Sequence, residues 1–285
     1  MRISCCIVCY KNPPDQLERV LGCVTASKVE VALYVIDNSK DDCLAGVAAK
    51  FGASYTHLPH NPGFGAAHNV AIREAIARNV DYHLVLNPDI AFDADVIPVL
   101  MDYMDRHPEI GLVMPNVFYP DGRQQYLCKL LPNPIDLLMR RFSPFLYRMS
   151  GRLAWYEMHE SGYDKIMDVP ALSGCFMLTR AALYGQIGSF DERFFMYLED
   201  VDLSRRIGSV ARTVYFPYVS VIHDFRKGSY RNLRLLYHHA RSAVQYFNKW
   251  GWFFDREKER INQLAMQKLL VVKRGSSDGE MEGDA

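Results

Sequence analysis

Residues 82–89 read YHLVLNPD, an apolar run that ends at an Asn-Pro pair and is followed by one carboxylate, Asp89. The run has the length and composition of a buried strand, and Asn-Pro is a turn signal. The sequence therefore predicts that Asn87 and Asp89 lie just beyond the C-terminal end of a central strand. Turn chemistry is one explanation for Asp89, because aspartate often caps turns and helix starts; a role in chemistry is the other.

The chain on the N-terminal side of this run alternates strand-like and helix-like segments. Strand-like segments cover residues 3–10, 29–39, 54–58 and 82–89, and helix-like segments cover residues 13–24, 42–52 and 66–77. This βαβαβαβ order is typical of an α/β fold, in which a mostly parallel sheet is flanked by helices on both faces. In such sheets, ligands bind at the C-terminal ends of the strands.

Hydrogen-bonding groups stand at all four of these strand ends. They are Tyr10, Asp37, the loop HNPGFGAAHN at residues 60–69, Asn87 and Asp89. Polar residues are common in turns, but turns alone rarely place them at all four strand ends. We expect these residues to form the rim of one shared pocket.

The second half of the chain lacks this alternation. Residues 126–165 are rich in proline, arginine and aromatic residues with poor periodicity, which predicts a loop-and-helix insertion over the pocket. No linker-like segment divides residues 1–225, so we expect one domain there. A basic and aromatic helical extension at residues 226–273 and a disordered tail at residues 274–285 are expected to follow.

Composition narrows the class of protein. The 285 residues include 33 Lys and Arg and 33 Asp and Glu, so nothing global favours nucleic acid, and no nucleic-acid partner is expected. The seven cysteines form no matching CxxC pairs and are expected to be small core residues in a reducing compartment. The absence of a convincing signal peptide and of an apolar run of about 18 residues indicates a cytoplasmic protein, soluble or peripheral on a membrane.

The glycine loop raises the possibility of a dinucleotide enzyme. Its GFGAAH segment starts like the fingerprint G-x-G-x-x-G, but His68 replaces the third glycine and the loop follows the third strand. These departures disfavour a nicotinamide enzyme. Gly63 and Gly65 still allow the backbone to approach a ligand closely in front of a helix start, although an ordinary turn explains them equally well.

The segment FDERFFMYLEDVDLSRR at residues 190–206 places carboxylates among aromatic and apolar residues. Desolvation raises a carboxyl pKa and makes the group a better base, whereas the amides of a helix start stabilise the anion of Asp200. The sequence leaves open which effect prevails. The alternative is a structural helix cap with Arg205 and Arg206 as salt partners of the carboxylates.

His223 ends an apolar strand, YVSVIH, and is a candidate metal ligand together with Asp89. One carboxylate, one imidazole and the oxygens of a diphosphate suit Mg²⁺ or Mn²⁺, which would act as a Lewis acid on the leaving group. A structural histidine is the simpler alternative for His223 taken alone.

Seven stretches in the same order resemble the inverting, GT-A-fold glycosyltransferases of family 2, and the resemblance covers nearly the whole chain. They are IVCYKNP, YVIDNS, NPGFGAAHN, LVLNPDI, LSGCFMLTR, GSFDERFFMYLEDVDLSRR and VIHDF. The LNPD form is most similar to bacterial rhamnosyltransferases of O-antigen and related polysaccharide assembly. The resemblance implies a nucleotide-binding half at residues 1–110, an acceptor half at residues 111–225, dTDP-L-rhamnose as donor and a GlcNAc-diphosphate-polyprenol acceptor.

The resemblance also implies residue roles. Asp200 matches the catalytic base, with Glu199 and the Gly174 backbone on the acceptor side. Asp89 matches the retained acid of the Asp-x-Asp metal motif and His223 the second metal ligand. The donor-side residues are Tyr10 and Asp37 beside the base, Gly63, Gly65 and Asn69 along the nucleotide and diphosphate, and Asn87, which replaces the first acid of the motif.

A lipid-linked acceptor requires a membrane surface, and the segment from Arg226 to Trp250 is a candidate for that contact. Its six basic residues alternate with aromatic and aliphatic ones and no acidic residue interrupts them. Such helices settle on anionic interfaces, here the inner face of the plasma membrane, unless the aromatic side packs on the protein's own core. Two different functions also fit the sequence: a UDP- or GDP-sugar transferase of the same fold, and a non-catalytic saccharide-binding protein.

Overall fold

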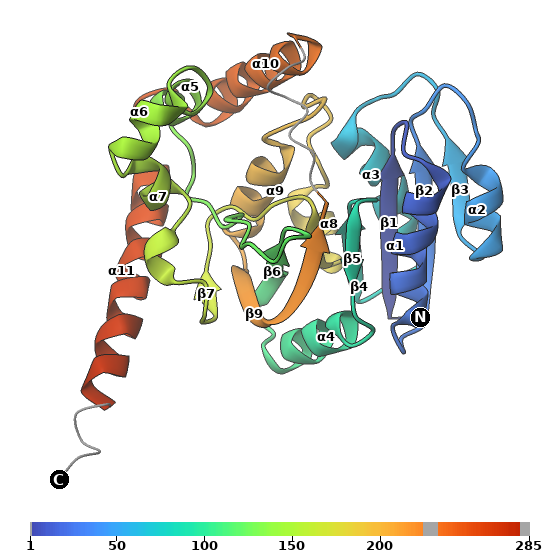
Figure 1. The fold of residues 1–285 in the computed structure, drawn as a ribbon, viewed down its shortest axis with the longest axis horizontal. Coiled ribbons are helices and arrows are strands. Elements are labelled where there is room, and N and C mark those ends of the chain that lie inside the picture. Colours follow the sequence, from blue (N-terminus) through green and yellow to red (C-terminus); the bar gives the residue numbers. More distant parts are fainter. Residues whose placement is uncertain (1, 225–232, 280–285) are drawn as a thin grey trace.

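The structure, a computed structural model, describes residues 2–224 and 233–279. These residues form a nine-stranded sheet in the order β3-β2-β1-β4-β8-β6-β9-β5, with β7 paired to β9 (Figure 1). The strands are β1 Ile3–Cys9, β2 Val31–Asp37, β3 Ser54–His57, β4 Tyr82–Leu86, β5 Ile90–Phe92, β6 Ile110–Phe118, β7 Met167–Asp168, β8 Phe176–Arg180 and β9 Arg212–His223.

Helices cover both faces of this sheet. They are α1 Pro14–Ala26, α2 Ala45–Lys50, α3 Phe64–Ala77, α4 Val96–Arg106, α5 Pro134–Phe142, α6 Pro144–Met149, α7 Arg152–Tyr156, the 3₁₀ helix η1 His159–Ser161, α8 Ala182–Ile187, α9 Glu199–Ile207, α10 Leu233–Trp250 and α11 Arg256–Gly279. Alternate side chains of β1 point to opposite faces. Cys5 and Ile7 pack with α1, whereas Cys6 and Val8 pack with α3. The predicted α/β fold with flanking helices is therefore confirmed.

The four strands β1 to β4 are parallel to one another, and β6 and β9 share their direction. Strand β8 is antiparallel to both β4 and β6, and it carries the chain back between the two halves of the sheet. The seven cysteines are free, and five of them are buried, as predicted. The prediction of a core position is wrong for Cys43, which is exposed, and Cys23 is only partly buried.

Strand β5 was not predicted. Its three residues follow the Asn-Pro turn and pair antiparallel with β9, with Ile90 opposite His223. Such a short strand has too few residues to show periodicity in the sequence. The pairing matters because it brings the residue before Ile90, Asp89, next to the end of β9.

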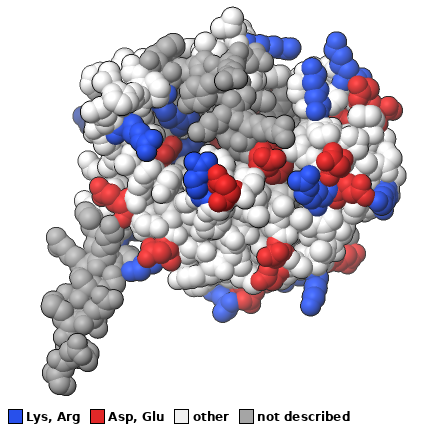
Figure 2. All heavy atoms as spheres, viewed as in Figure 1, with Lys and Arg blue, Asp and Glu red and all other residues white. Residues whose placement is uncertain are grey.

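The insertion at residues 126–165 contains α5, α6, α7 and η1, and α10 and α11 form the C-terminal extension, as predicted. One expectation is corrected. Helix α11 continues through Arg274 to Gly279, where a disordered tail was predicted, because extending an existing helix adds a backbone hydrogen bond per residue without a new nucleation step. Residues 280–285 lie outside the described residues. Figure 2 shows basic and acidic side chains intermixed over one face of the molecule.

Candidate active site

Asp89 and His223 face each other at the end of the β5–β9 ladder. The His223 Nε2 atom lies 3.3 Å from Asp89 Oδ1. The backbone fixes this approach, because the Asp89 carbonyl also accepts a hydrogen bond from the Asp224 amide at 3.0 Å. Both side chains are largely buried, and Oδ1 of Asp89 has no hydrogen-bond partner within the described residues.

Gln125 orients the His223 ring, a role that the sequence did not reveal. The Gln125 Nε2 group donates to the His223 carbonyl at 2.8 Å, so its Oε1 atom faces His223 Nδ1 at 3.0 Å. An amide oxygen only accepts, so Nδ1 carries a proton and, in the neutral ring, the lone pair of Nε2 points toward Asp89. This second contact is typical of histidines that serve as metal ligands.

Helix α9 begins at Glu199 after a strained turn. Tyr197 and Leu198 have φ angles of 73° and 67°, in the left-handed region that non-glycine residues rarely adopt. Such strain is common at functional sites. It turns the chain so that the first helical residues, Glu199 and Asp200, present their carboxyl groups to a cavity of about 120 Å³.

The two adjacent carboxyl groups have different surroundings. Asp200 Oδ1 accepts a hydrogen bond from the Val201 amide at 2.9 Å, and its Oδ2 accepts one from the Gly174 amide at 3.0 Å. Glu199 is buried, and burial first and the Asp200 charge second hold its pKa well above the usual range. Desolvation thus acts mainly on Glu199, whereas amide donors act on Asp200.

The segment Ser173–Cys175 connects the Asp89 and Asp200 regions. The Asn87 amide donates to the Cys175 carbonyl at 2.9 Å, and the neighbouring Gly174 amide binds Asp200. Burial chiefly, with smaller contributions from the charges of Asp89 and Asp200, raises the pKa of the Cys175 thiol to about 12. The predicted residues on β4, α9 and β9 therefore converge on one region.

Comparison with known proteins shows the family of this chain. The sequence matches the model described as Glycosyl transferase family 2 over residues 4–176. The N-acetylglucosaminyl-diphospho-decaprenol L-rhamnosyltransferase of Mycobacterium tuberculosis is 30% identical over 279 residues, covering 92% of this chain and 90% of the relative. The chain belongs to glycosyl transferase family 2. The Rhamnosyltransferase WbbL of Escherichia coli K12 is 26% identical over 275 residues, covering 90% of this chain and 97% of the relative.

Solved glycosyltransferases share the fold. The mannosyltransferase PcManGT of Pyrobaculum calidifontis, in complex with GDP-Man and Mn²⁺, aligns with a TM-score of 0.57 at 14% identity and covers 100% of this chain and 76% of that one. The S. aureus protein TarS aligns with a TM-score of 0.55 at 15% identity over 79% of this chain, which spans only 37% of TarS. The GT-A architecture of this glycosyltransferase is thus confirmed.

On the donor side of the glycosyltransferase, Tyr10 is exposed just beyond β1, whereas the Asp37 side chain is fully buried. Both Asp37 oxygens accept hydrogen bonds, from the Ser39 amide at 2.9 Å and from the Tyr55 hydroxyl at 2.8 Å. In this structure Asp37 therefore stabilises the loop after β2 through these two hydrogen bonds. The predicted contact of Tyr10 and Asp37 with a nucleotide base stays a prediction.

Gly63, Gly65 and Asn69 have different contacts from those expected. A Cβ atom on Gly63 would lie 2.3 Å from the Phe195 carbonyl oxygen, and one on Gly65 would lie 2.8 Å from Phe190 Cβ. Asn69 is buried, and its amide bonds both the carbonyl and the N–H of Phe190. These three residues therefore clamp α3 against the segment before α9; their approach to a diphosphate stays a prediction.

Arg205 and Arg206 pair with carboxylates other than Glu199 and Asp200. Arg206 Nε lies 2.9 Å from Asp202 Oδ2, and Arg205 forms a two-pronged pair with Asp255 at 2.6 and 2.8 Å. The structural alternative therefore holds for Asp202, which pairs with Arg206, whereas no ion pair of these arginines with Glu199 or Asp200 occurs among the described contacts.

Asp202 also anchors α10. Lys249 Nζ lies 2.7 Å from Asp202 Oδ1, and the Trp250 indole N–H donates to the same oxygen at 2.8 Å. Ser242 of α10 donates to the Met196 carbonyl at 2.8 Å, in the strained turn before α9. The C-terminal extension thus holds the segment that carries Asp200.

Three basic side chains that line the Asp200 cavity were not predicted from the sequence: Lys129, Arg140 and His239. Lys129 carries a detectable signal, since it is a single charge within the apolar run LCKLL. Arg140 and His239 carry none, because their positions depend on how α5 and α10 pack.

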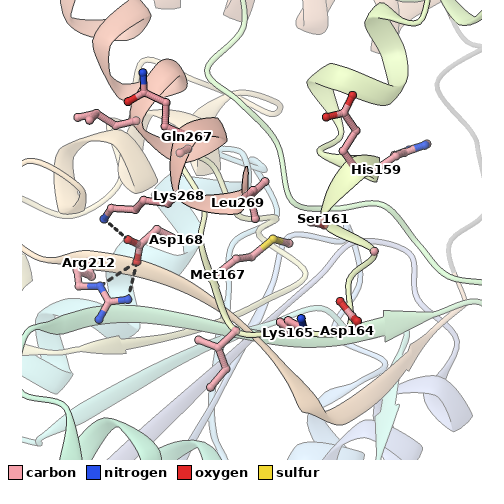
Figure 3. Close-up of a pocket in the computed structure, with 15 residues that line it drawn as sticks. His159, Ser161, Asp164, Lys165, Met167, Asp168, Arg212, Gln267, Lys268 and Leu269 are labelled. Atoms are coloured by element: carbon pink, nitrogen blue, oxygen red, sulfur yellow. Dashed lines mark hydrogen bonds and ion pairs between the residues drawn. The ribbon is translucent and has the colours of Figure 1, made fainter. Parts of the chain in front are cut away.

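A larger cavity of about 840 Å³ lies between α11 and the β7–β9 edge (Figure 3). Its main charged contact is Asp168, which pairs with Arg212 at 2.8 Å and with Lys268. This cavity shares no lining residue with the Asp200 cavity. Both oxygens of Asp168 are thus engaged in ion pairs within the protein.

Proposed function

We propose that this enzyme transfers L-rhamnose from dTDP-L-rhamnose to a saccharide hydroxyl on a GlcNAc-diphosphate-polyprenol lipid, with inversion, in cell-surface polysaccharide synthesis. The observation that carries the proposal is Asp200, held by two amides at a cavity mouth and connected through Ser173–Cys175 to Asp89 and His223. The mycobacterial relative, an L-rhamnosyltransferase acting on N-acetylglucosaminyl-diphospho-decaprenol, supports the choice of sugar and acceptor.

In the proposed reaction, Asp200 accepts the proton of the acceptor hydroxyl as that oxygen attacks the anomeric carbon. The new carbon–oxygen bond forms opposite the breaking bond to the nucleotide diphosphate, so the configuration inverts. The Gly174 and Val201 amides hold the carboxylate in place during this step. Burial, and after it the Asp200 charge, raise the pKa of Glu199 and so favour its neutral form, which limits the negative charge beside the base.

The Asp89–His223 pair fits a divalent cation. His223 Nε2 lies 3.3 Å from Asp89 Oδ1, which has no hydrogen-bond partner in the described residues, so a cation could take one ligand atom from each side chain. Neighbouring ligands of Mg²⁺ or Mn²⁺ lie about 3 Å apart, given metal–ligand distances of roughly 2.1 Å. No cluster of three or more His, Cys, Asp or Glu ligands occurs in the described part of the chain, so diphosphate oxygens would complete the set.

When bound, the cation would neutralise charge on the leaving diphosphate. Asn87, in place of an acid, lies near the same turn and supplies an amide where a carboxylate ligand is expected. Strict metal dependence therefore stays a prediction, and Mg²⁺ or Mn²⁺ remains the expected ion.

We also propose that the enzyme sits peripherally on the anionic inner face of the membrane. Among the described residues, no helix is both long and apolar enough to cross a bilayer. Tyr246 and Phe247 of α10 pack on the protein's own core, but Phe253 and Phe254 after α10 are 65% and 97% exposed. The predicted basic residues Arg226, Lys227 and Arg231 lie outside the described residues.

Helices α5 and α6 add to this surface and lie beside α10 in Figure 1. Their exposed apolar side chains are Ile135, Leu138, Phe145, Leu146 and Met149. Exposed apolar groups this concentrated on one hairpin are typical of an interaction surface. Flotation with phosphatidylglycerol vesicles tests the proposal: the enzyme should float with them, and a double variant Phe145→Ser with Phe254→Ser should float less. Recovery of the unmodified enzyme only in the dense fraction would contradict it.

The donor is tested by transfer assays with dTDP-L-rhamnose, a UDP-sugar and a GDP-sugar on one synthetic GlcNAc-diphosphate-alkyl acceptor, each with and without Mn²⁺. Transfer from dTDP-L-rhamnose alone, stimulated by Mn²⁺, is expected. Preference for a UDP- or GDP-sugar would replace the rhamnose assignment. Binding of nucleotides without any transfer would favour a non-catalytic saccharide-binding protein.

A further inference from the structure

Two cationic side chains line the same cavity as the proposed base. Lys129 lies between β6 and α5, and Arg140 lies on α5. The Lys129 backbone is fixed by a pair of hydrogen bonds with Ala171, at 3.0 and 2.9 Å, two residues before Ser173. Arg140 lies over the Tyr156 ring, with its Cζ atom 5.9 Å from the ring centre. Both cations are therefore attached to ordered parts of the cavity wall.

The charge of Lys129 is incompletely balanced. Across the described residues, its Nζ atom forms no hydrogen bond or ion pair within the protein. Burial first, and the Arg140 charge second, lower the pKa of the Lys129 ammonium, and the charges of Glu157 and Asp200 only partly oppose this. The Arg140 charge thus acts on Lys129 as a repulsive one, and an anion bound between the two cations would relieve that repulsion.

We propose that Lys129 and Arg140 bind the diphosphate of the lipid-linked acceptor and thereby hold its sugar hydroxyl at Asp200. This inference rests on the proposed function, because it assigns part of the acceptor of that reaction. Arginine binds phosphate oxygens through a planar fork and lysine as a point charge, and both are common diphosphate ligands.

The exposed side of α5 indicates where the lipid chain of the acceptor would leave the cavity. Leu137 and Arg140 face the cavity, whereas Ile135 and Leu138 on the same helix are exposed. Phe145, Leu146 and Met149 of α6 continue the exposed apolar side. An acceptor with its sugar at Asp200 and its diphosphate at Arg140 would thus leave the cavity where the hairpin meets the bilayer. The sugar would lie at Asp200, the diphosphate at Arg140, and the lipid chain along the exposed apolar side of α5 and α6.

The experiment compares two acceptors that differ only in charge: a GlcNAc-diphosphate-alkyl lipid and an uncharged GlcNAc-alkyl glycoside with the same alkyl chain. The measured quantity is the ratio of kcat/KM for the two acceptors. Lys129→Met and Arg140→Met should each lower this ratio by about 10- to 100-fold, the range expected for losing a charge-assisted hydrogen bond. Lys129→Arg should restore most of the ratio. Arg148→Met, which removes an exposed cation of α6 outside the cavity, should leave the ratio and the activity unchanged.

The outcomes separate this inference from the proposed function. If the unmodified enzyme transfers sugar to neither acceptor, the proposed function fails. If it prefers the diphosphate acceptor and Lys129→Met and Arg140→Met keep that preference, only the diphosphate site is overturned. A purely structural role for the two cations would lower transfer to both acceptors equally, which also overturns it. Thermal stabilisation by dTDP shows for each variant that the donor half is folded.

Discussion

The two halves of this glycosyltransferase are held together by different forces. Strands β1, β2 and β4 and helix α1 bury mostly apolar side chains, such as Ile7, Leu21 and Leu84, and these described elements contain no buried ion pair. The segment with α9 and α10 has an apolar cluster too, and it adds buried ion pairs, above all Arg205 with Asp255 and Asp202 with Lys249. Apolar packing tolerates small displacements, whereas hydrogen-bonded pairs fix direction. The comparison suggests that the first half supplies a scaffold and the second half supplies the orientation of Asp200.

The largest loss of stability should come from breaking the most buried ion pair, Arg205 with Asp255. Asp255→Ala leaves the Arg205 guanidinium buried without its partner, which typically costs about 3–5 kcal/mol of unfolding free energy. Urea unfolding measures the loss, and hydrogen exchange should locate it in α9 and α10. Asp191→Ala is the matched control with a smaller cost, because Lys249 loses one carboxylate partner but keeps Asp202. If Asp255→Ala lowers the unfolding free energy by less than about 1 kcal/mol, buried ion pairs do not stabilise the second half in the way proposed.

A core truncation tests the other half. Leu21→Ala on α1 should cost about 2–5 kcal/mol through lost burial and a cavity. The remaining folded enzyme should keep its kcat within a few-fold, because no contact of Asp200 depends on α1. The measurements are urea unfolding and steady-state kinetics. A fall in kcat comparable with the effect of an α10 variant would show that the scaffold also orients the base.

Acid should weaken the first half through its buried histidines. Burial lowers the pKa of His83 to about 3 and lowers that of His68 well below its usual value, so both stay neutral in the folded state. The unfolded chain takes up protons as the pH falls below about 6.5, so stability falls with pH, by about 1.4 kcal/mol per unit for each histidine well below that value.

His68→Leu should therefore flatten the dependence of unfolding free energy between pH 6 and pH 5 by up to about 1.4 kcal/mol. The measured quantity is the unfolding free energy of the variant minus that of the unmodified protein. The carboxyl groups contribute equally to both proteins, so their contribution drops out of this difference. This includes Glu199, whose raised pKa makes stability rise as the pH falls. Equal slopes for the two proteins would mean that His68 becomes protonated in the folded state.

The smallest effect is expected at the neighbour of the base. Glu199→Gln should change stability by less than about 1 kcal/mol and kcat only a few-fold, because the raised pKa of Glu199 favours the neutral carboxyl, which the amide resembles in size and charge. Thermal unfolding and steady-state kinetics measure both quantities. A loss of activity as large as that expected for Asp200 would give Glu199 the catalytic role.

The sequence predicted the scaffold better than the site. Long apolar runs such as that of β1 showed the parallel strands, and LNPD correctly indicated a strand end at Asn87. The approach of His223 to Asp89 depends on β5, which is too short to be recognised from its pattern. Gln125 and Arg140 gave no signal, because their roles arise from tertiary packing of segments far apart in the chain. For Asn69 the family resemblance implies a ligand contact, which stays a prediction; the hydrogen bonds of its amide to Phe190 could not be read from the sequence.

The central claim, that Asp200 is the base of a single displacement, is most directly tested by comparing Asp200→Asn with the unmodified enzyme in a single-turnover transfer assay. The account predicts that the chemical step slows by about 10²- to 10⁴-fold while dTDP affinity stays within a few-fold. An Asp200→Asn enzyme that still transfers sugar within tenfold of the unmodified rate would contradict it.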